Sequence, residues 1–237
     1  MLELFSWGNS GWGDELFSGL KITVALALTT LPFGLAIGFI VASGSLAPRR
    51  PAQMFANGYT TMMRGLPELL TLFLVYNGVG MGLNSLLSWA IPNAPSIIIS
   101  PFVAGVVALA LVFGAFAAEV LRGAFQSLDR GQIEAAMAIG MRPYQIFLRV
   151  KLPQIWRFAL PGIGNLWISL LKDTSLVSVI SLNDIMRVTK VAVGVTKQPF
   201  TFYLAACCLY WLMCILSEIA LGRMEKRASR GVRGSVT

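Results

Sequence analysis

Two apolar stretches of the sequence contain polar side chains whose spacing could gather them around a small charged ligand. These side chains are Arg64, Glu68, Asn165, Ser169, Lys172 and Asp173. In the second stretch, positions 165, 169 and 172 are spaced i, i+4 and i+7, so on a helix they form one polar stripe with Asp173 beside it. Polar groups inside a membrane are costly and usually functional, and the two stretches therefore predict a substrate path.

The chemistry of these groups fits a small ligand that carries both a carboxylate and an ammonium group. Arg64 could hold a carboxylate by two parallel hydrogen bonds, and Asp173 or Asn165 could bind an ammonium group. The alternative is that Arg64 and Glu68, four residues apart, form an internal ion pair that stabilises helix packing. Lys172 and Asp173 could do the same, because buried charges generally need a partner. The sequence has no histidine and shows no metal-ligand cluster or nucleophile–base pair, so we expect neither a metal site nor catalysis.

The composition predicts that both stretches lie in a membrane. Of the 237 residues, 56% are hydrophobic and only 13% are charged, whereas about 25% of the residues in a soluble domain are charged. Five stretches approach or exceed the ~20 residues that a membrane-spanning helix needs. They are residues 22–44, 62–87, 97–121, 158–182 and 200–221. We therefore expect an all-α integral membrane protein with five transmembrane helices, forming a single domain over residues 1–237.

Lysine and arginine predict the orientation. They give the chain a net charge of +8 and gather after the first span, between the third and fourth spans, and in a basic tail, residues 222–237. Five spans put these three regions on one side, which the positive-inside rule makes cytoplasmic. The amino terminus is then outside and the carboxyl terminus cytoplasmic. Because topology accounts for the basic excess, we expect no nucleic-acid partner.

A charged, amphipathic segment, residues 131–154, separates the third and fourth spans. Its apolar positions Ile133, Ala136, Met137 and Gly140 follow the i, i+3, i+4, i+7 pattern of one helical face. Gly140 could end this helix, Pro143 suits the first turn of a second one, and Pro153 would stop the second helix before the next span. The two helices would expose Glu134 and Arg142 to a partner, although a helix that merely rests on lipid headgroups has the same pattern.

The segment "EAAMAIGMRPYQIFLRVKLPQ" resembles the EAA loop of ABC importer permeases. The matching residues are Glu134, Ala135, Ala136, Gly140, Leu152 and Pro153. The stretches "EVLRGAFQSLDRGQIEAAMAIG", "MMRGLPELLTLF" and "GNLWISLLKDTSLVSVIS" are similar to the polar amino-acid uptake branch, of the histidine, lysine-arginine-ornithine and opine type. The resemblance extends from about Gly19 to the tail. It implies the type I ABC importer fold, with this loop as the coupling helix that docks in a cleft of a cytoplasmic ATPase.

The same resemblance implies the function and the partners. The chain would be the permease subunit of an ATP-driven, binding-protein-dependent importer of polar amino acids, with a basic amino acid, histidine or an opine favoured. Its partners would be a sister permease, two ATPase subunits, an external substrate-binding protein and the lipid of a bacterial inner membrane. The chain has no phosphate-binding glycine loop. ATP and Mg would therefore be bound by the partner ATPase, and this chain would bind no cofactor and be no enzyme itself.

Three of the polar residues, Arg64, Asn165 and Asp173, resemble in position those that line the translocation site of some members of this branch. Leu166 follows Asn165, where members with a cation-binding pocket tend to carry Glu. This departure favours a heterodimer with a different sister permease, or selectivity left to the external binding protein. The alternative function is a secondary transporter without an ATPase, which would need internal repeats and a self-contained ion site. The sequence shows no convincing repeat.

Overall fold

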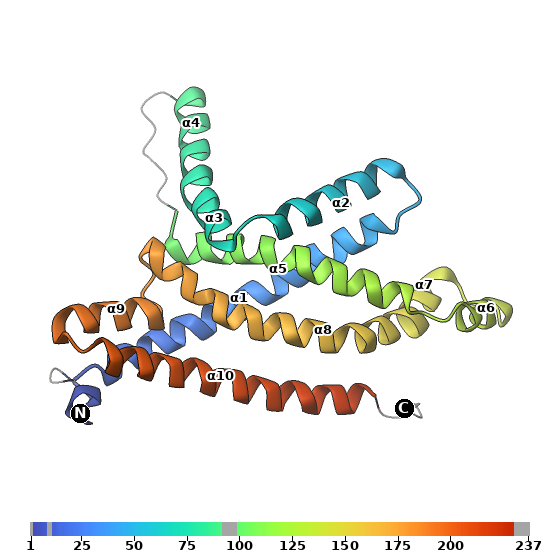
Figure 1. The fold of residues 1–237 in the computed structure, drawn as a ribbon. Helices are drawn as coiled ribbons and strands as arrows, with labels where there is room; N and C mark the ends of the chain where they lie inside the picture. Colours follow the sequence, from blue (N-terminus) through green and yellow to red (C-terminus); the bar gives the residue numbers. More distant parts are fainter. Residues whose placement is uncertain (1, 9–10, 92–98, 230–237) are drawn as a thin grey trace.

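The computed structural model describes residues 2–8, 11–91 and 99–229, and every regular element in these ranges is helical (Figure 1). The α-helices are α1 (Gly13–Ser45), α2 (Arg50–Gly65), α3 (Glu68–Phe73), α4 (Gly80–Ala90), α5 (Pro101–Gln126), α6 (Arg130–Ala138), α7 (Pro143–Ile146), α8 (Leu152–Asp173), α9 (Ile185–Thr196) and α10 (Pro199–Ala228). Leu2–Phe5 and Thr174–Ile180 form 3-10 helices, and Leu74–Val79 and Phe147–Lys151 form π-helical turns.

Five helical segments are long and apolar enough to cross a membrane, as the sequence predicts. They are Gly13–Ser45, Glu68–Trp89, Pro101–Gln126, Pro143–Ile180 and Pro199–Ala228. Helices α1, α5, α8 and α10 run beside one another (Figure 1). The first span begins nine residues before the predicted start at residue 22, and α10 continues through the first part of the predicted basic tail to Ala228. The last residues of that tail, 230–237, lie outside the described residues.

Small residues allow α1 and α5 to approach closely. A Cβ added at Gly38 of α1 would lie only 2.8 Å from the Cβ of Ala117, and one added at Gly34 would meet the ring of Phe113. On α5, Gly114 faces Ile37 in the same way. Backbones that pack this tightly gain dispersion contacts, which is how helices associate in lipid. Helices α3 and α8 both pack against α5, so the closely packed α1–α5 pair sets their positions.

The predicted second span, 62–87, is not one helix. Leu66 has an extended backbone (φ −91°, ψ 140°) and ends α2, and Pro67 precedes the first residue of α3. A residue before proline is disfavoured in the α-helical region, which explains the break. Helix α2 packs on α1 and α5, and α3 packs on α5, whereas α4 turns away from the other helices (Figure 1). Arg64 and Glu68 consequently lie on two different helices.

Helices α6 and α7 form an elbow at the end of the molecule opposite α9 and the amino terminus (Figure 1). Pro143 begins α7 as predicted, and Ile146, the last residue of α7, is buried. The prediction that Pro153 stops the second helix is wrong, because α7 continues through the π-helical turn into α8 and Pro153 lies in the first turn of α8. A proline is tolerated inside this continuous helix because it directly follows the π-helical turn, a local adjustment that can satisfy the backbone groups that proline leaves free. The apolar face of α6 is also narrower than predicted, since Ala136 is buried but Met137 is 55% exposed.

Candidate functional site

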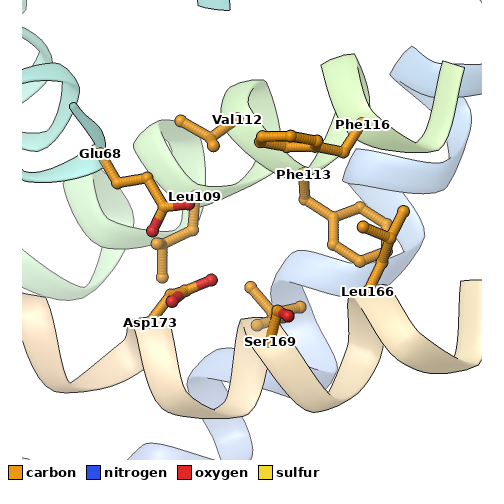
Figure 2. A pocket seen from close by; sticks show the side chains of 9 residues that line it. Glu68, Leu109, Val112, Phe113, Phe116, Leu166, Ser169 and Asp173 are labelled. Carbon is orange, nitrogen blue, oxygen red and sulfur yellow. The ribbon is translucent and has the colours of Figure 1, made fainter. Parts of the chain in front are cut away.

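A small cavity of about 120 Å³ lies between α3, α5 and α8. It is lined by Glu68, Leu109, Val112, Phe113, Phe116, Leu166, Ser169, Leu170 and Asp173. Figure 2 shows the carboxyl groups of Glu68, from α3, and Asp173, from α8, pointing toward one another across the cavity. Side chains of α5 form the apolar wall. Two acidic groups thus meet in a pocket whose remaining lining is almost entirely apolar.

The predicted ion pairs of Glu68 and Asp173 are not formed. The close ion pairs within the described part of the chain both involve Glu119. Arg64 cannot face Glu68 along one helix, because the break at Leu66 and Pro67 separates them. Lys172 and Asp173 are consecutive on α8, and consecutive helical side chains do not face each other. Asp173 interacts instead with Glu68, which leaves an acidic pair without a bound basic side chain.

Arg64 lies beside this cavity rather than inside it. Its guanidinium is 3.8 Å from the carboxylate of Glu119, which also binds Arg122 at 3.0 Å. The same guanidinium lies over the ring of Phe116, 5.6 Å from the ring centroid, and Phe116 lines the cavity. The Arg64 side chain is still 46% exposed. A positive group therefore lies on the outer side of Phe116, next to the cavity that holds the acidic pair.

The predicted stripe on α8 divides between the cavity and the surface. Asn165, Ser169 and Lys172 lie on one face of α8, as their spacing predicts, and all three are exposed. Of these three, only Ser169 lines the cavity, where it joins Asp173. Leu166, the residue at which the sequence departs from members with a cation-binding pocket, forms part of the cavity wall. Because the Leu166 side chain is apolar, the charged residues in the cavity lining are the two acids, Glu68 of α3 and Asp173 of α8.

The sequence did not indicate the contribution of α5. Leu109, Val112, Phe113 and Phe116 are apolar residues of an apolar span, so no polar signal distinguished them from the rest of the helix. Their spacing of three or four residues was visible, but it marks any helix face that packs against neighbours. The role of Glu119 as the partner of Arg64 was hidden for a different reason, since it depends on how α2 packs against α5.

The elbow has a second set of defined contacts. The carboxylate of Asp129 accepts a hydrogen bond of 2.8 Å from the backbone N–H of Gly131 and so caps α6. The side-chain amide of Gln154, in α8, donates a hydrogen bond of 2.7 Å to the side-chain oxygen of Gln132 in α6. Glu134 and Arg142 are both exposed. The elbow is thus attached to α8 and presents charged side chains outward.

Comparison with known proteins decides the family. Residues 34–230 match the model of the family described as the binding-protein-dependent transport system inner membrane component. This chain belongs to that family. The match confirms the predicted resemblance, and it accounts for the five apolar helices of a multi-pass inner membrane protein.

Full-length relatives of this inner membrane component are similar over nearly the whole chain. The nopaline transport system permease protein NocQ of Agrobacterium fabrum is 43% identical over 232 residues, covering 98% of each chain. The arginine ABC transporter permease protein ArtQ of Escherichia coli is 39% identical and covers 91% of this chain and 95% of its own. A chain in the crystal structure of an amino acid ABC transporter with histidines superposes with a TM-score of 0.76 and 31% identity. That superposition covers 91% of this chain and 95% of the other, and it confirms the predicted fold class.

Proposed function

We propose that this chain is the permease subunit of an ATP-driven, binding-protein-dependent importer of basic amino acids, histidine or related opines. The observation that carries the proposal is the acidic pair of Glu68 and Asp173 in one cavity, with no arginine or lysine of the described residues in close ion-pair contact with it. Two carboxyl groups without a basic partner attract a cation. The names of the relatives, which include nopaline and arginine permeases, support the same class of substrate.

Such a substrate carries a cationic group and a carboxylate, and groups of opposite charge to each of these lie on the two sides of Phe116. Glu68 and Asp173 bind the cationic group, and Ser169 adds a hydroxyl beside them. Arg64, over the outer face of Phe116, binds the carboxylate during entry or exit. The apolar walls hold the aliphatic or aromatic part of the substrate. Asn165 and Lys172, which do not line this cavity, extend the path along the exposed face of α8.

Uptake measurements with two isosteric variants test this assignment. Glu68→Gln and Asp173→Asn keep the shape of each side chain but remove its charge, so each should lower uptake of labelled arginine at least tenfold. Uptake of an amino acid with a neutral side chain, such as glutamine, should depend less on the acidic charge, and the ratio of arginine uptake to glutamine uptake should therefore fall. The matched control is Glu218→Gln, the same kind of isosteric change at an exposed acid of α10 outside the cavity.

Normal arginine uptake by both variants would reject the acidic pair as the cation site. A wild-type protein that transports only neutral or acidic amino acids would reject the proposed substrate class. The amount of folded protein in the membrane must be measured for each variant, so that a loss of uptake is not confused with a loss of protein.

The elbow is proposed to couple this path to an ATPase. Glu134 and Arg142 are exposed at its surface, and Gln154 and Gln132 attach it to α8. Its end of the molecule is then cytoplasmic, and α9 and the amino terminus lie outside. The aligned EAA positions Ala135, Leu152 and Pro153 shape the elbow, and ATP and Mg belong to the ATPase.

The proposed complex contains this chain, a sister permease, two ATPase subunits and an external substrate-binding protein. Five spans whose cavity is lined by only three helices need a second permease to enclose a path. Leu166, which adds no charge to the cavity lining, favours a sister permease of different sequence. Purification of the tagged chain from its native membrane checks the composition. Recovery as a monomer without an ATPase would contradict the complex, and recovery only as a self-pair would contradict the sister permease.

A further inference from the structure

An apolar groove lies on a face of the molecule that the proposed substrate path does not use. It is formed by α1, α8 and α10 and has a volume of about 390 Å³. Its lining residues are apolar except for Ser217, and none of them lines the acidic cavity. Trp156 and Trp167 of α8 and Ala220 and Met224 of α10 are among them. Because the groove is bounded by helices that cross the membrane, hydrocarbon or protein must fill it.

The length of the groove matches one leaflet of a bilayer. On α8 it extends from Trp156 to Trp167, which at 1.5 Å per residue is about 16 Å along the helix axis. Half of a hydrocarbon core of about 30 Å is nearly the same length. Trp156 lies one turn from the start of α8, next to the elbow, so the groove occupies the half of the membrane nearer to the elbow.

Positive charge stands at the elbow end of the groove. On α10 the lining positions Ser217, Ala220 and Met224 recur every three or four residues, and the next position on that face is Arg227. Arg227 is exposed, and neither of the ion pairs found among the described residues involves it. The nearest acidic residue in sequence, Glu225, is two positions away, a spacing that places it on a different face of the helix.

Tryptophan and arginine together at one end of a span are typical of the headgroup region of a membrane. Trp156 is 43% exposed there, and Arg223 and Lys226 of α10 are exposed near Arg227. Clustered basic residues at the cytoplasmic end of a transmembrane helix attract anionic lipids. A zwitterionic headgroup would bring an ammonium group to the same cluster, and like charges repel.

We propose that the groove binds one acyl chain of an anionic phospholipid of the inner leaflet, whose phosphate is bound by Arg227. The acyl chain lies along Trp156 and Trp167, and the headgroup lies at the end of α10. This inference uses the membrane orientation given under the proposed function, but it does not depend on the transported substrate. A transmembrane helix of the sister permease is the competing occupant.

Fluorescence quenching by brominated lipids tests the groove directly. The full chain, purified with the partners that accompany it, is placed in nanodiscs that contain either phosphatidylglycerol or phosphatidylethanolamine with identical dibrominated acyl chains. The signal of Trp156 is the difference between the wild-type protein and Trp156→Phe. We expect at least twofold stronger quenching of Trp156 by the phosphatidylglycerol.

Two kinds of variant separate the charge from the groove. Arg227→Gln should abolish the preference for phosphatidylglycerol, whereas Lys226→Gln, its neighbour on a different face of α10, should lower it only slightly. Ala220→Phe fills the groove and should weaken quenching by both lipids. If Ala220→Phe lowers the melting temperature of the complex, Ser217→Phe replaces it in the same test.

Three results would overturn the proposal. Equal quenching by the two lipids in the wild-type protein would remove the charge selectivity, and equal effects of Arg227→Gln and Lys226→Gln would remove the assignment of the phosphate site. An absence of quenching by either lipid would mean that protein covers Trp156, which is the outcome expected if the sister permease occupies the groove.

Discussion

Gly140 offers a test of how the elbow is held, because its backbone conformation is one that most residues avoid. Its φ is +80°, in the left-handed region. Its N–H donates a hydrogen bond of 3.0 Å to the carbonyl of Met137, and the N–H of Met141 donates one of 3.1 Å to the carbonyl of Ala136. These two bonds form the Schellman motif that ends many helices. The motif turns the chain from α6 toward α7.

The cost of a side chain at this position follows from the backbone alone. A Cβ added at Gly140 would meet nothing within 4 Å, so a substitution causes no clash inside this chain. The left-handed conformation costs an L-residue about 1–2 kcal/mol, and about 1.4 kcal/mol corresponds to a factor of ten in an equilibrium. Gly140→Ala should therefore reduce the population of the observed turn, relative to other conformations, by about 5- to 30-fold. Gly140→Asn should reduce it less, since asparagine tolerates this region.

The assay compares ATPase binding and coupled transport in these variants. We expect the affinity for the ATPase, and ATP hydrolysis stimulated by the binding protein, to fall in the order wild type, Gly140→Asn, Gly140→Ala. Gly123→Ala is the matched control. Gly123 lies in α5 near the elbow with open space around it and no left-handed backbone, so this variant should behave as wild type.

Two outcomes would refute this reasoning. If Gly140→Asn is as harmful as Gly140→Ala, or more so, the position is needed for its lack of bulk against a partner rather than for its backbone. If Gly140→Ala retains full ATPase binding and coupling, the turn is not part of the coupling surface, and the elbow merely rests on the membrane.

Three further variants test separate parts of the molecule. Arg64→Ala should abolish uptake with little loss of thermal stability, because the half-exposed ion pair of Arg64 with Glu119 is worth only ~0.2–1 kcal/mol. Reduced stability with normal transport per folded molecule would contradict the role of Arg64 in binding the substrate. Gly38→Ala should lower stability by about 1–3 kcal/mol, since its Cβ would lie 2.8 Å from an atom of α5. Gly44→Ala, whose Cβ would lie 3.5 Å from the nearest atom, should have little effect in the same melting assay. Burial raises the pKa of Asp184 from 3.8 to about 6, so the stability that its protonated form contributes is present below pH 3.8 and is lost as the pH rises through about 6. The melting temperature of Asp184→Asn should therefore depend less on pH than that of the wild-type protein. An unchanged pH dependence in this variant would rule out Asp184 as the source of the pH dependence.

The sequence was sufficient to predict the parts of this fold that depend on local properties. The five spans follow from runs of apolar residues that match the thickness of a bilayer. The turn at Gly140 and the start of α7 at Pro143 follow from the backbone preferences of glycine and proline. Each of these signals lies within a few residues of the feature that it predicts, and no knowledge of packing is needed to use it.

The errors arose where a local rule was applied across a break or where packing decided the outcome. Arg64 and Glu68 have the spacing of a helical pair, but Pro67 between them restricts Leu66 to an extended backbone. That restriction was visible in the sequence and could have prevented the error. The pairing of Arg64 with Glu119 was not visible, because the two residues are far apart in the chain and meet only when α2 packs on α5.

The same break explains how the cavity acquires two acidic groups. If α2 and α3 were one helix, Arg64 would lie one turn from Glu68 and could neutralise it. The extended residue Leu66 instead lets Arg64 bind Glu119, and Glu68 is left to face Asp173. Asp173 ends α8, which is helical without interruption back to the elbow. A displacement of the elbow can therefore reach one carboxyl group of the pair through α8, while the other belongs to α3, a helix that packs on α5. Relative movement of α8 and α3 would change the distance between the two carboxyl groups, and with it the affinity of the cavity for a cation.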